Sequence, residues 1–587
     1  MEPFKCHSCL VPIFLVIVGC HGYINYLAIR LPLQGERPPP GSPWPQPKQW
    51  QQSPDLLTID PIKFQFTSDT DCDIITKAFE RYHSLIFGYK GLWVAEDKPT
   101  LPGLEVVISS KTCGKYPSLS MDESYSLVIN NTATLTATEV WGFLRGLETF
   151  SQLVYDNQGE LLINKTSITD VPRFPYRGSH LDTARHYIPI PVLKQNLDAM
   201  SYNKLNVFHW HIVDDQSFPF VSKTFPKLSE KGAYSKLHLY TPEAVADIIE
   251  YARLRGIRVI PEFDTPGHTA SWGIAYQELL TTCWANGKPG VAIYNKHAEH
   301  EILDPTKNFT YEFLGQFFKE VSEVFPDEYL HMGMDEGYYY CWFSNPNITE
   351  FMTEQGFGKD YFKLEQYYSE RVLGMISDLD KKYIIWQDPV ENGAQVRNDS
   401  IVTIWKGGYS DWRRYMESVS SKGYYTILSS CWYLNYLTYP PAWRQFYSCD
   451  PLDFTGSQAA KDRVLGGQTC LWAEFVDGTN LLTRMWPSAS AAAERLWSPA
   501  EVRDNDTAYF RLDQQRCRML RRGIPTEPLL GGYCGDYEWG FEKDEPQLES
   551  TERPTTCINT STCLLSISHY QLLCVVLVLS YLLNSCK

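Results

Sequence analysis

The sequence predicts an α/β protein in which a (β/α)8 TIM barrel follows a small α/β domain. From residue 175 onward, short apolar runs typical of strands alternate with longer stretches whose apolar residues recur at helical spacing. Eight barrel strands are expected between residues 175 and 528, at 178–183, 205–213, 257–263, 329–333, 383–387, 401–405, 425–429 and 464–471. Helices are expected between them, including 192–200, 242–254, 311–325 and 361–379.

Polar residues recur immediately after these strands, which is the second observation that favours a barrel. They are Arg185, Asp214, Asp215, Asp264, His268, Asp335, Glu336, Asp388, Trp405 and Glu474. The carboxyl ends of all strands meet at one face of a TIM barrel, and the chemistry of such proteins lies at that face. The repeated placement is more specific than any single polar residue.

The segment before the barrel divides into two parts. Residues 23–54 are expected to be a Pro-rich linker, and the part of it that is rich in Pro and Gln, 36–54 (ERPPPGSPWPQPKQWQQSP), is expected to form neither helix nor sheet. Residues 55–174 are expected to form the small α/β domain, with strands at 104–109 and 126–129 and a helix at 139–155. No catalytic constellation is evident there, so a structural domain is predicted. The barrel domain is expected to span 175–545.

Both chain ends indicate the secretory pathway. Residues 1–22 contain the apolar run CLVPIFLVIVGC after Lys5 and are typical of a signal peptide, with an uncleaved signal anchor as the alternative. Residues 546–587 end in the apolar run YQLLCVVLVLSYLL, which small residues precede. This order resembles a GPI-anchor signal, although residues 563–583 are also long enough to span a bilayer. Either alternative places the protein at the outer cell surface, with lysosomal or fully secreted protein as other destinations.

Charge and composition exclude some partners. The net charge of -16 argues against nucleic acids and anionic membrane surfaces as main partners. The aromatic fraction of 14% suits either a large core or platforms for the apolar faces of sugars. Two histidines, His209 and His211, share one strand face, but no Cys/His cluster has zinc spacing. We therefore expect no metal and no cofactor.

Cysteines and glycosylation sequons agree with a secreted chain. The sequence has 16 Cys, eleven of them between the probable signal and the hydrophobic tail, an odd number that leaves at least one thiol unpaired. Seven N-x-S/T sequons begin at Asn130, Asn164, Asn308, Asn347, Asn398, Asn505 and Asn559.

The adjacent acids Asp335 and Glu336 are the strongest catalytic candidates. They close the apolar strand 329–334 (YLHMGM) at the predicted rim of the barrel. Two acids in one pocket cannot easily both ionise, so burial and like charge should raise one pKa and provide a proton donor. Cleavage of a glycosidic bond requires such a donor, because an alkoxide is a poor leaving group. The pair alone leaves open which of the two acids this is; the family resemblance given below implies that it is Glu336, as a buried acid.

Several motifs resemble those of family 20 glycoside hydrolases, the β-N-acetylhexosaminidases of the animal lysosomal and insect type. Residues 331–336 (HMGMDE) are similar to the family's H-x-G-G-D-E motif. Further similar segments, found in order between about residues 60 and 534, are LDTARHY at 181–187, LNVFHWHIVDD at 205–215, EFDTPGH at 262–268, CWYLN at 431–435 and CLWAE at 470–474.

The resemblance implies an exo-acting retaining enzyme that removes terminal N-acetylglucosamine by substrate-assisted catalysis, with N-acetylgalactosamine as the alternative sugar. It assigns Glu336 as the acid and base, and Asp335 as the residue that holds the substrate's acetamido N–H. The substrate-binding residues it implies are Arg185, Asp214, His268, Trp386, Trp405, Tyr433, Asn435, Trp472 and Glu474. Asp214 and His268 would form a chain to Glu336, and the three Trp would wall the pocket. The expected partner is thus a glycan that ends in N-acetylhexosamine, with homodimerisation a further expectation.

The sequence departs from the family pattern at a few positions. Met334 replaces the second Gly of the motif, and strand alternation should direct Gly333 and Asp335 inward and Met334 outward. Gly337 stands where an apolar residue is usual, and Ala473 replaces a usual Gly. Tyr436 follows Asn435 where some relatives have an Arg that accepts sulfated sugars, which predicts a preference for neutral substrates.

The resemblance also implies disulfides Cys72–Cys113, Cys283–Cys341 and Cys517–Cys534, and their nearness in sequence suggests that Cys431 and Cys449 pair as well. Two alternatives to an active enzyme remain from the sequence. One is a catalytically impaired glycan-binding protein at the cell surface, in which Met334 disables turnover. The other is an interaction protein that uses the barrel as a scaffold.

Overall fold

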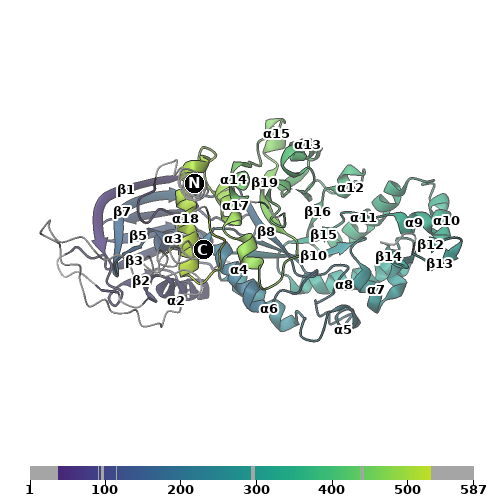
Figure 1. The fold of residues 1–587 in the computed structure, drawn as a ribbon, viewed down its shortest axis with the longest axis horizontal. Helices are drawn as coiled ribbons and strands as arrows, with labels where there is room; N and C mark the ends of the chain where they lie inside the picture. The colour runs from purple at the N-terminus through teal and green to yellow at the C-terminus, as the bar shows by residue number, and fades with distance from the viewer. Residues whose placement is uncertain are drawn as a thin grey trace, which may run out of the picture. The chain divides into compact units, whose positions relative to one another are not determined.

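The computed structural model describes residues 37–89, 92–93, 98–113, 115–292, 298–436, 438, 442–529 and 534. The predicted signal peptide and the predicted hydrophobic tail lie outside the described residues. Figure 1 shows the sheet of the N-terminal domain and the barrel as separate layers of secondary structure. Among the described residues, no helix combines the length and the apolar character needed to cross a bilayer.

The N-terminal domain is a mixed sheet covered by two helices. Its main strand order is β1-β7-β4-β5-β3-β2, with β6 pairing with β7. The strands are β1 (Gln49–Thr58), β2 (Gln65–Ser68), β3 (Gly103–Ile108), β4 (Tyr125–Ile129), β5 (Ala133–Ala137), β6 (Tyr155–Asn157) and β7 (Glu160–Asp170). The helices are α2 (Asp73–Phe87) and α3 (Val140–Leu153), and every residue of α3 is buried.

The predicted linker is wrong over its second half. Gln49 begins strand β1, which pairs with β7, and the side chain of Trp44 is fully buried. Proline is tolerated in this strand because β1 lies at the edge of the sheet and its register shifts between Gln52 and Leu56, around Pro54. The Pro-rich composition therefore concealed an edge strand with a bulge.

The second domain is a closed barrel, as predicted. Its order is β10-β15-β16-β17-β18-β19-β8-β9, and all neighbouring strands run parallel. The strands are β8 (Tyr176–Asp182), β9 (Val207–His211), β10 (Arg258–Thr265), β15 (Tyr329–Gly333), β16 (Lys382–Trp386), β17 (Ile401–Ile404), β18 (Tyr425–Leu428) and β19 (Val464–Leu471). All eight predicted strands are thus present, each with bounds within a few residues of those expected.

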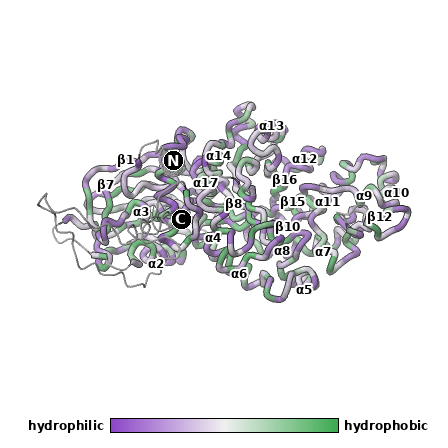
Figure 2. The backbone as a smooth tube through the Cα atoms, viewed as in Figure 1, coloured by the Kyte–Doolittle hydropathy of each residue, from purple (hydrophilic) through white to green (hydrophobic). Residues whose placement is uncertain are grey.

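Helices follow the strands and cover the barrel. The longer ones are α4 (Ile190–Tyr202), α6 (Pro242–Arg253), α8 (Asn308–Val324), α11 (Tyr361–Asp378), α13 (Gly408–Ser421), α17 (Ser488–Trp497) and α18 (Asn505–Arg521). Helix α6 illustrates why they form: the Thr241 side chain accepts a hydrogen bond from the Ala244 N–H, Pro242 occupies the first turn, and Arg253 lies in the last turn. Figure 2 shows hydrophobic residues gathered along the barrel strands, while α10 (Pro346–Glu354) is largely hydrophilic.

Shorter elements lie in the connections between the barrel strands and the longer helices. They are α5 (Lys227–Gly232), α7 (Ala270–Ala275), α9 (Tyr340–Ser344), α12 (Asp388–Glu391), α14 (Trp443–Ser448), α15 (Gln458–Lys461) and α16 (Leu481–Met485), the 3-10 turns η1 (Gln277–Leu279) and η2 (Ser430–Trp432), and two small antiparallel pairs. The pairs are β11 (Leu280–Thr282) with β14 (His300–Leu303), and β12 (Trp284–Ala285) with β13 (Lys288–Pro289).

The barrel interior is layered, with an apolar base and a polar layer above it. The base consists of Tyr176, Val207, Ile260, Tyr329, Ile384, Ile401 and Ile427. Two residues further along their strands, His209, Glu262, His331 and Trp386 lie inside the barrel, all of them buried. The packed base closes the barrel at the amino ends of its strands. A ligand can therefore approach the polar layer from the carboxyl ends, where the predicted site lies.

Candidate active site

Asp335 is the buried member of the acid pair. Only 6% of the residue is exposed, and burial raises its pKa to about 6. The neighbouring carboxyl group of Asp264 has a pKa that is raised well above its usual range by burial and by the charge of Asp335. Asp264 is therefore the protonated partner, and Asp335 is the carboxyl group that ionises in the pair.

Glu336 lies at the rim, and its predicted burial is wrong. Its side chain is 38% exposed, and its carboxylate lies 4.0 Å from His268 Nε2. Strand β15 has ended at Gly333, and Met334 and Glu336 both have a positive φ, so the chain turns here and the adjacent acids meet different surroundings. The raised pKa that we expected for one acid of this pair belongs to Asp335.

The predicted chain from Asp214 to Glu336 is present as geometry. His268 Nδ1 lies 3.2 Å from Asp214 Oδ1, and the other ring nitrogen faces Glu336. Burial opposes the charged form of His268, but the Asp214 carboxylate outweighs it and raises the pKa of His268 to about 9. Asp214 remains ionised, because His268, His211 and Arg185 hold its pKa well below the usual range despite burial. His268 is thus a cation beside Glu336.

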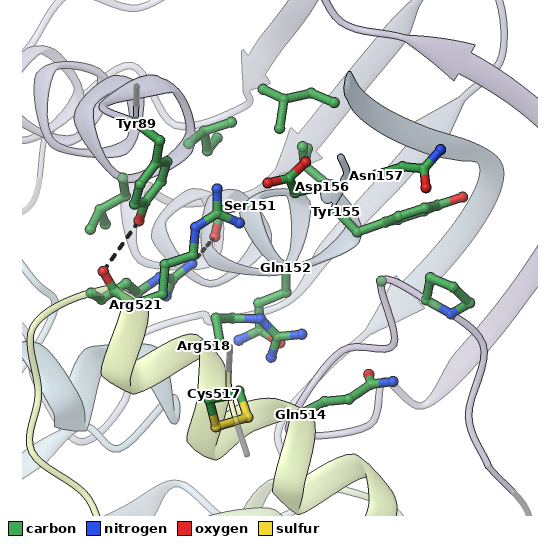
Figure 3. Close-up of a pocket in the computed structure, with 18 of the residues that line it drawn as sticks. Tyr89, Ser151, Gln152, Tyr155, Asp156, Asn157, Gln514, Cys517, Arg518 and Arg521 are labelled. Carbon is green, nitrogen blue, oxygen red and sulfur yellow. Dashed lines mark hydrogen bonds between the residues drawn. A yellow bond between two sulfur atoms is a disulfide. The ribbon is translucent and has the colours of Figure 1, made fainter. Parts of the chain in front are cut away.

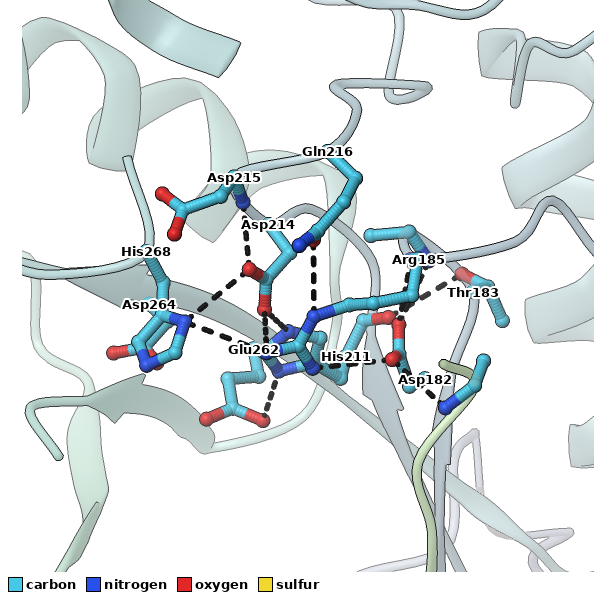
Figure 4. A network of polar contacts seen from close by, with 12 residues as sticks. Asp182, Thr183, Arg185, His211, Asp214, Asp215, Gln216, Glu262, Asp264 and His268 are labelled. Carbon is cyan, nitrogen blue, oxygen red and sulfur yellow. Dashed lines mark hydrogen bonds and ion pairs between the residues drawn. The ribbon is translucent and has the colours of Figure 1, made fainter. Parts of the chain in front are cut away.

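Arg185 is fixed from two sides. Its guanidinium group contacts Asp182 at 3.1 Å and Asp214 at 2.9 Å, and it lies over the ring of Trp472 with 5.0 Å to the centroid. Figure 4 shows Asp214 at the centre of this network, between Arg185, His211 and His268. A guanidinium group held in this way offers its remaining N–H donors in a fixed direction.

The predicted aromatic wall is assembled around one cluster. Trp386, Tyr433 and the free thiol of Cys470 are buried together, and Trp405 and Trp472 pack against them. The rings of Trp386 and Trp472 lie 6.1 Å apart and are tilted by 39°. Trp405 donates its indole N–H to Asp388 Oδ2 at 2.8 Å, and Asp388 Oδ1 accepts a 3.4 Å hydrogen bond from the Glu336 N–H. Asp388 therefore links the wall to the rim acid.

The two remaining predicted residues also lie at this end of the barrel. Asn435 follows Tyr433 after β18, and its buried Oδ1 has no partner among the described residues. Glu474 is an exposed residue after β19, and its charge helps to raise the pKa of Arg185. The structure thus brings together every predicted catalytic and binding residue.

Glu262 is a central residue that sequence reasoning missed. One carboxylate oxygen accepts hydrogen bonds from Trp386 Nε1 at 2.6 Å, and the other accepts from His211 Nδ1 at 2.8 Å. His211 in turn contacts Asp214 Oδ2 at 2.7 Å, and the two carboxylates raise its pKa to about 10 although burial lowers it. The signal that could have identified Glu262 was its place inside the similar segment EFDTPGH, on the same strand face as Asp264.

Histidine and carboxylate side chains below the pocket have metal-ligating chemistry. His209, Glu262 and His331 place donor atoms within 4.8 Å of one another, as do His180, His211 and Glu262. However, both Glu262 oxygens already accept hydrogen bonds, and the Gly333 N–H donates to His331 Nδ1 at 3.1 Å. Both ring nitrogens of His180, and Nε2 of His209 and His331, have no hydrogen-bond partner among the described residues. Through Glu262 the layer holds the indole of Trp386.

Gly333 and Met334 take the directions predicted for them. A Cβ atom at Gly333 would lie 1.7 Å from Asp264 Oδ1, so only glycine fits inside the barrel here. Met334 points outward into the core around the barrel, and its N–H donates to Asp264 Oδ1 at 2.8 Å. Met334 has a φ of +73°, in the left-handed region that favours glycine.

The cysteine pairing agrees with the expectation. Within the part of the chain that the structure describes, the disulfides are Cys72–Cys113, Cys283–Cys341, Cys431–Cys449 and Cys517–Cys534, so the suggested fourth pair is confirmed. Cys341 lies five residues after Glu336, and its bond ties α9 to β11 and the segment after it.

A separate cavity of about 580 Å³ lies away from the barrel rim (Figure 3). It is lined by the ends of α2 and α3, by β6 and by α18, with Arg518 and Arg521 among its side chains. Burial and the charge of Arg522 lower the pKa of Arg518 to about 9. None of the predicted catalytic or sugar-binding residues lines it.

Comparison with known proteins gives consistent matches. Residues 174–500 match "Glycosyl hydrolase family 20, catalytic domain", and residues 43–153 match "beta-acetyl hexosaminidase like". Human beta-hexosaminidase subunit beta is 47% identical over 521 residues, which cover 86% of this chain and 92% of that protein. The alpha subunit from Rattus norvegicus is 45% identical over 507 residues, covering 84% and 94%. The solved structure of a Flavobacterium johnsoniae chitobiase aligns with a TM-score of 0.72 at 31% identity, covering 82% of this chain and 73% of that one.

Proposed function

This chain belongs to glycosyl hydrolase family 20, and we infer that it is an exo-acting β-N-acetylhexosaminidase that releases terminal N-acetylglucosamine or N-acetylgalactosamine from glycans. The observation that carries the mechanism is the division of labour within one acid pair. Asp335 is buried beside the tryptophan cluster, whereas Glu336 is at the open rim beside a histidinium. One acid can thus contact the bound sugar while its neighbour reaches the bond that breaks.

The first half of the reaction uses the substrate's own amide as nucleophile. The 2-acetamido oxygen attacks C1, the bond from C1 to the glycosidic oxygen breaks, and Glu336 donates its proton to that oxygen. The acetamido nitrogen becomes positive in the resulting oxazolinium ion. The Asp335 carboxylate accepts the hydrogen bond of this N–H and stabilises the charge, while Asp264 stays protonated beside it.

The second half restores the enzyme. Glu336, now a carboxylate, removes a proton from water as the water attacks C1, and the ring of the oxazolinium ion opens to give the sugar with its original anomeric configuration. His268 Nε2 lies 4.0 Å from the Glu336 carboxylate, so its ring adjoins the acid during this stage. Asp214 keeps His268 charged throughout.

The remaining predicted residues bind and orient the sugar. We assign the walls of the pocket to Trp386, Trp405 and Trp472, with Trp386 held by Glu262. Tyr433 directs the acetamido oxygen towards C1. Arg185, Asn435 and Glu474 bind hydroxyl groups, and the unpartnered Oδ1 of Asn435 is an acceptor suited to such a donor.

Substitution of Glu336 tests the proposal. Glu336→Gln removes the proton and should lower kcat on 4-nitrophenyl N-acetyl-β-D-glucosaminide by about 10²- to 10⁴-fold. The variant should still bind an N-acetylglucosamine thiazoline, which mimics the oxazolinium ion. Glu350→Gln, on the exposed side of α10, is the matched control. Wild-type protein that binds the thiazoline without hydrolysing the glycoside would instead support the impaired glycan-binding alternative.

The substrate should be neutral. Tyr436 offers no positive charge beside Asn435, so a sulfated sugar would gain no ion pair at this position. The kcat/KM for 4-nitrophenyl N-acetyl-β-D-glucosaminide should exceed that for its 6-sulfate. Equal values for the two would contradict this assignment.

We further propose that the protein acts in the secretory pathway, tethered at the outer cell surface through residues 546–587. The four disulfides and the seven sequons support passage through an oxidising compartment. Release by phosphatidylinositol-specific phospholipase C would identify the tether as a lipid anchor, and retention would favour a spanning segment. Both mammalian relatives are named as subunits, which supports an oligomer, and we propose a homodimer.

A further inference from the structure

An exposed cluster of aromatic rings begins two residues after Glu336. Tyr338 is 58% exposed, Phe343 48% and Phe362 51%. Tyr338 lies in the segment that joins β15 to α9, Phe343 lies on α9, and Phe362 lies in the first turn of α11. Soluble proteins rarely leave several large apolar side chains exposed together unless the patch binds something.

The exposure results from how α9 is anchored. Cys341 and Trp342 are fully buried, Cys341 through its bond to Cys283 and Trp342 through a hydrogen bond from its indole N–H to the Leu303 carbonyl. The next residue, Phe343, is rotated by about 100° around the axis of the short helix and therefore points away from this buried side. Its ring meets that of Tyr361 edge to face at 4.2 Å, so the ring is held in place although half of it faces solvent.

The rings of α9 and α11 form one connected surface. Tyr339 bridges its members, because its ring lies 6.2 Å from Phe343 and 6.2 Å from Phe362 and stacks on Trp342 at 5.0 Å. Tyr338 adjoins the catalytic pair closely enough that, after burial, the charges of Glu336 and Asp335 raise the pKa of its hydroxyl. The surface therefore runs from the acid pair outward over α9 and the start of α11.

We propose that this aromatic strip, formed by Tyr338, Phe343 and Phe362 with Tyr339 and Tyr361 behind them, binds the remainder of the glycan chain beyond the sugar that is released. The proposal rests on the assignment of Glu336 as the proton donor. The oxygen that receives the proton belongs to the leaving chain, so this chain must extend from the open side of Glu336, where the strip begins. Pyranose rings present apolar C–H faces that pack on aromatic rings, and the uncharged strip suits a neutral oligosaccharide.

Chitin oligosaccharides of two to five units provide the test, with 4-nitrophenyl N-acetyl-β-D-glucosaminide as the substrate with a short leaving group. In the full-length protein, kcat/KM should rise with chain length. The double variant Phe343→Ala/Phe362→Ala should lower the ratio of kcat/KM for the pentasaccharide to that for the nitrophenyl glycoside by about three- to tenfold, the range expected for one or two aromatic contacts.

Two control variants separate binding from structure. Phe343→Tyr/Phe362→Tyr retains the rings and should retain the ratio. Tyr425→Ala removes a ring of similar exposure from the first residue of β18, at the opposite end of the barrel, and should leave the ratio unchanged. An unaltered ratio in the alanine double variant would overturn the proposal. A change in oligomeric state, measured by sedimentation, with the ratio intact would also overturn the proposal, because the strip would then bind a second copy of the chain. Loss of binding to phosphatidylcholine vesicles with the ratio intact would overturn it as well, because the strip would then bind a lipid surface.

The outcome is distinguishable from failure of the proposed function. If Glu336→Gln hydrolyses the nitrophenyl glycoside at the wild-type rate, the catalytic assignment fails whatever the strip does. If Glu336→Gln is inactive and the length dependence survives in the alanine double variant, only the strip assignment fails.

Discussion

Met334→Gly tests whether the unusual residue before the acid pair restrains catalysis or merely fills the core. Met334 adopts a φ of +73°, and a non-glycine residue in this region carries a strain of about 1–2 kcal/mol. Glycine at this position would remove that strain. If strain alone mattered, the variant would be more stable than the wild-type protein.

The buried side chain opposes that gain. Met334 is 1% exposed, and removing a buried methionine side chain costs about 2–5 kcal/mol. Glycine also loses about 0.5–1 kcal/mol more backbone entropy on folding than alanine. The cost outweighs the relief of strain, so Met334→Gly should lower the free energy of unfolding by about 2–3 kcal/mol.

Activity should respond differently from stability. The substitution leaves the Met334 N–H free to donate to Asp264, and the backbone conformation before Asp335 is one that glycine adopts readily. We therefore expect kcat on the nitrophenyl glycoside to stay within about threefold of wild type, because no contact of the catalytic pair is removed. Urea unfolding and initial rates measure the two effects on the same preparation.

Neighbouring substitutions calibrate the result. Met334→Leu conserves volume at the same φ and should cost less than about 1.5 kcal/mol. Gly333→Ala should abolish activity, because the added Cβ would overlap the Asp264 carboxylate. A rise in kcat of tenfold or more in Met334→Gly, or a gain in its stability, would refute the reasoning and show that methionine here holds the acids in an unfavourable position.

Three further predictions follow from the buried groups. Glu262→Gln should lower kcat/KM by about ten- to hundredfold. The amide has a single acceptor oxygen, so it can accept a hydrogen bond from Trp386 or from His211 but its NH2 group cannot accept the other. A loss under twofold in steady-state kinetics would contradict this. The pKa of Asp335 is raised to about 6, so ionising its carboxyl group lowers the stability of the folded protein as the pH rises from 4 to 7. Asp335→Asn should match the stability of wild type near pH 4 and exceed it by about 2–3 kcal/mol at pH 7. Urea unfolding that shows no pH-dependent difference between the two proteins would exclude the raised pKa. The double variant Cys283→Ser/Cys341→Ser removes a disulfide between residues that are 58 positions apart. It should lower the free energy of unfolding by about 3–4 kcal/mol, which calorimetry can compare with the intact protein.

The barrel could be predicted because each of its strands carries a local signal. The run before Asp335 is apolar and bounded by turn residues, and the same holds for the other seven strands. Parallel strands place their carboxyl ends at one face, so polar residues separated by up to 289 positions, Arg185 and Glu474, could be assigned to one site before any coordinates were known. This assignment used topology alone.

The edge strand β1 could not be predicted by the same reasoning. Its residues include Pro54 and three Gln, which disfavour a strand when judged locally. The pairing with β7 is made more than one hundred residues away in the sequence, and the bulge between Gln52 and Leu56 accommodates the proline. Tertiary context therefore overrode composition, and the predicted linker was wrong where this context acts.

The exposure of Glu336 was missed because pair arguments do not specify which acid is buried. Like charge and burial predict one raised pKa for two adjacent acids, but they do not determine its owner. That depends on Asp264, which approaches from β10 and lies beside Asp335, and on Asp388, which accepts from the Glu336 N–H and keeps this residue at the rim. Both partners come from other strands.

This division has a chemical consequence for the pair. An acid that stabilises a developing positive charge is most effective in a place where water is excluded, because the interaction is weakened less by solvent. A proton donor to a leaving group must instead reach the face by which that group departs. Burial of Asp335 and exposure of Glu336 meet both requirements with adjacent residues, and the aromatic strip on the exposed side then lies where the departing chain must pass. A structure with a bound pentasaccharide whose reducing end turned away from α9 would break this connection while leaving the roles of the two acids intact.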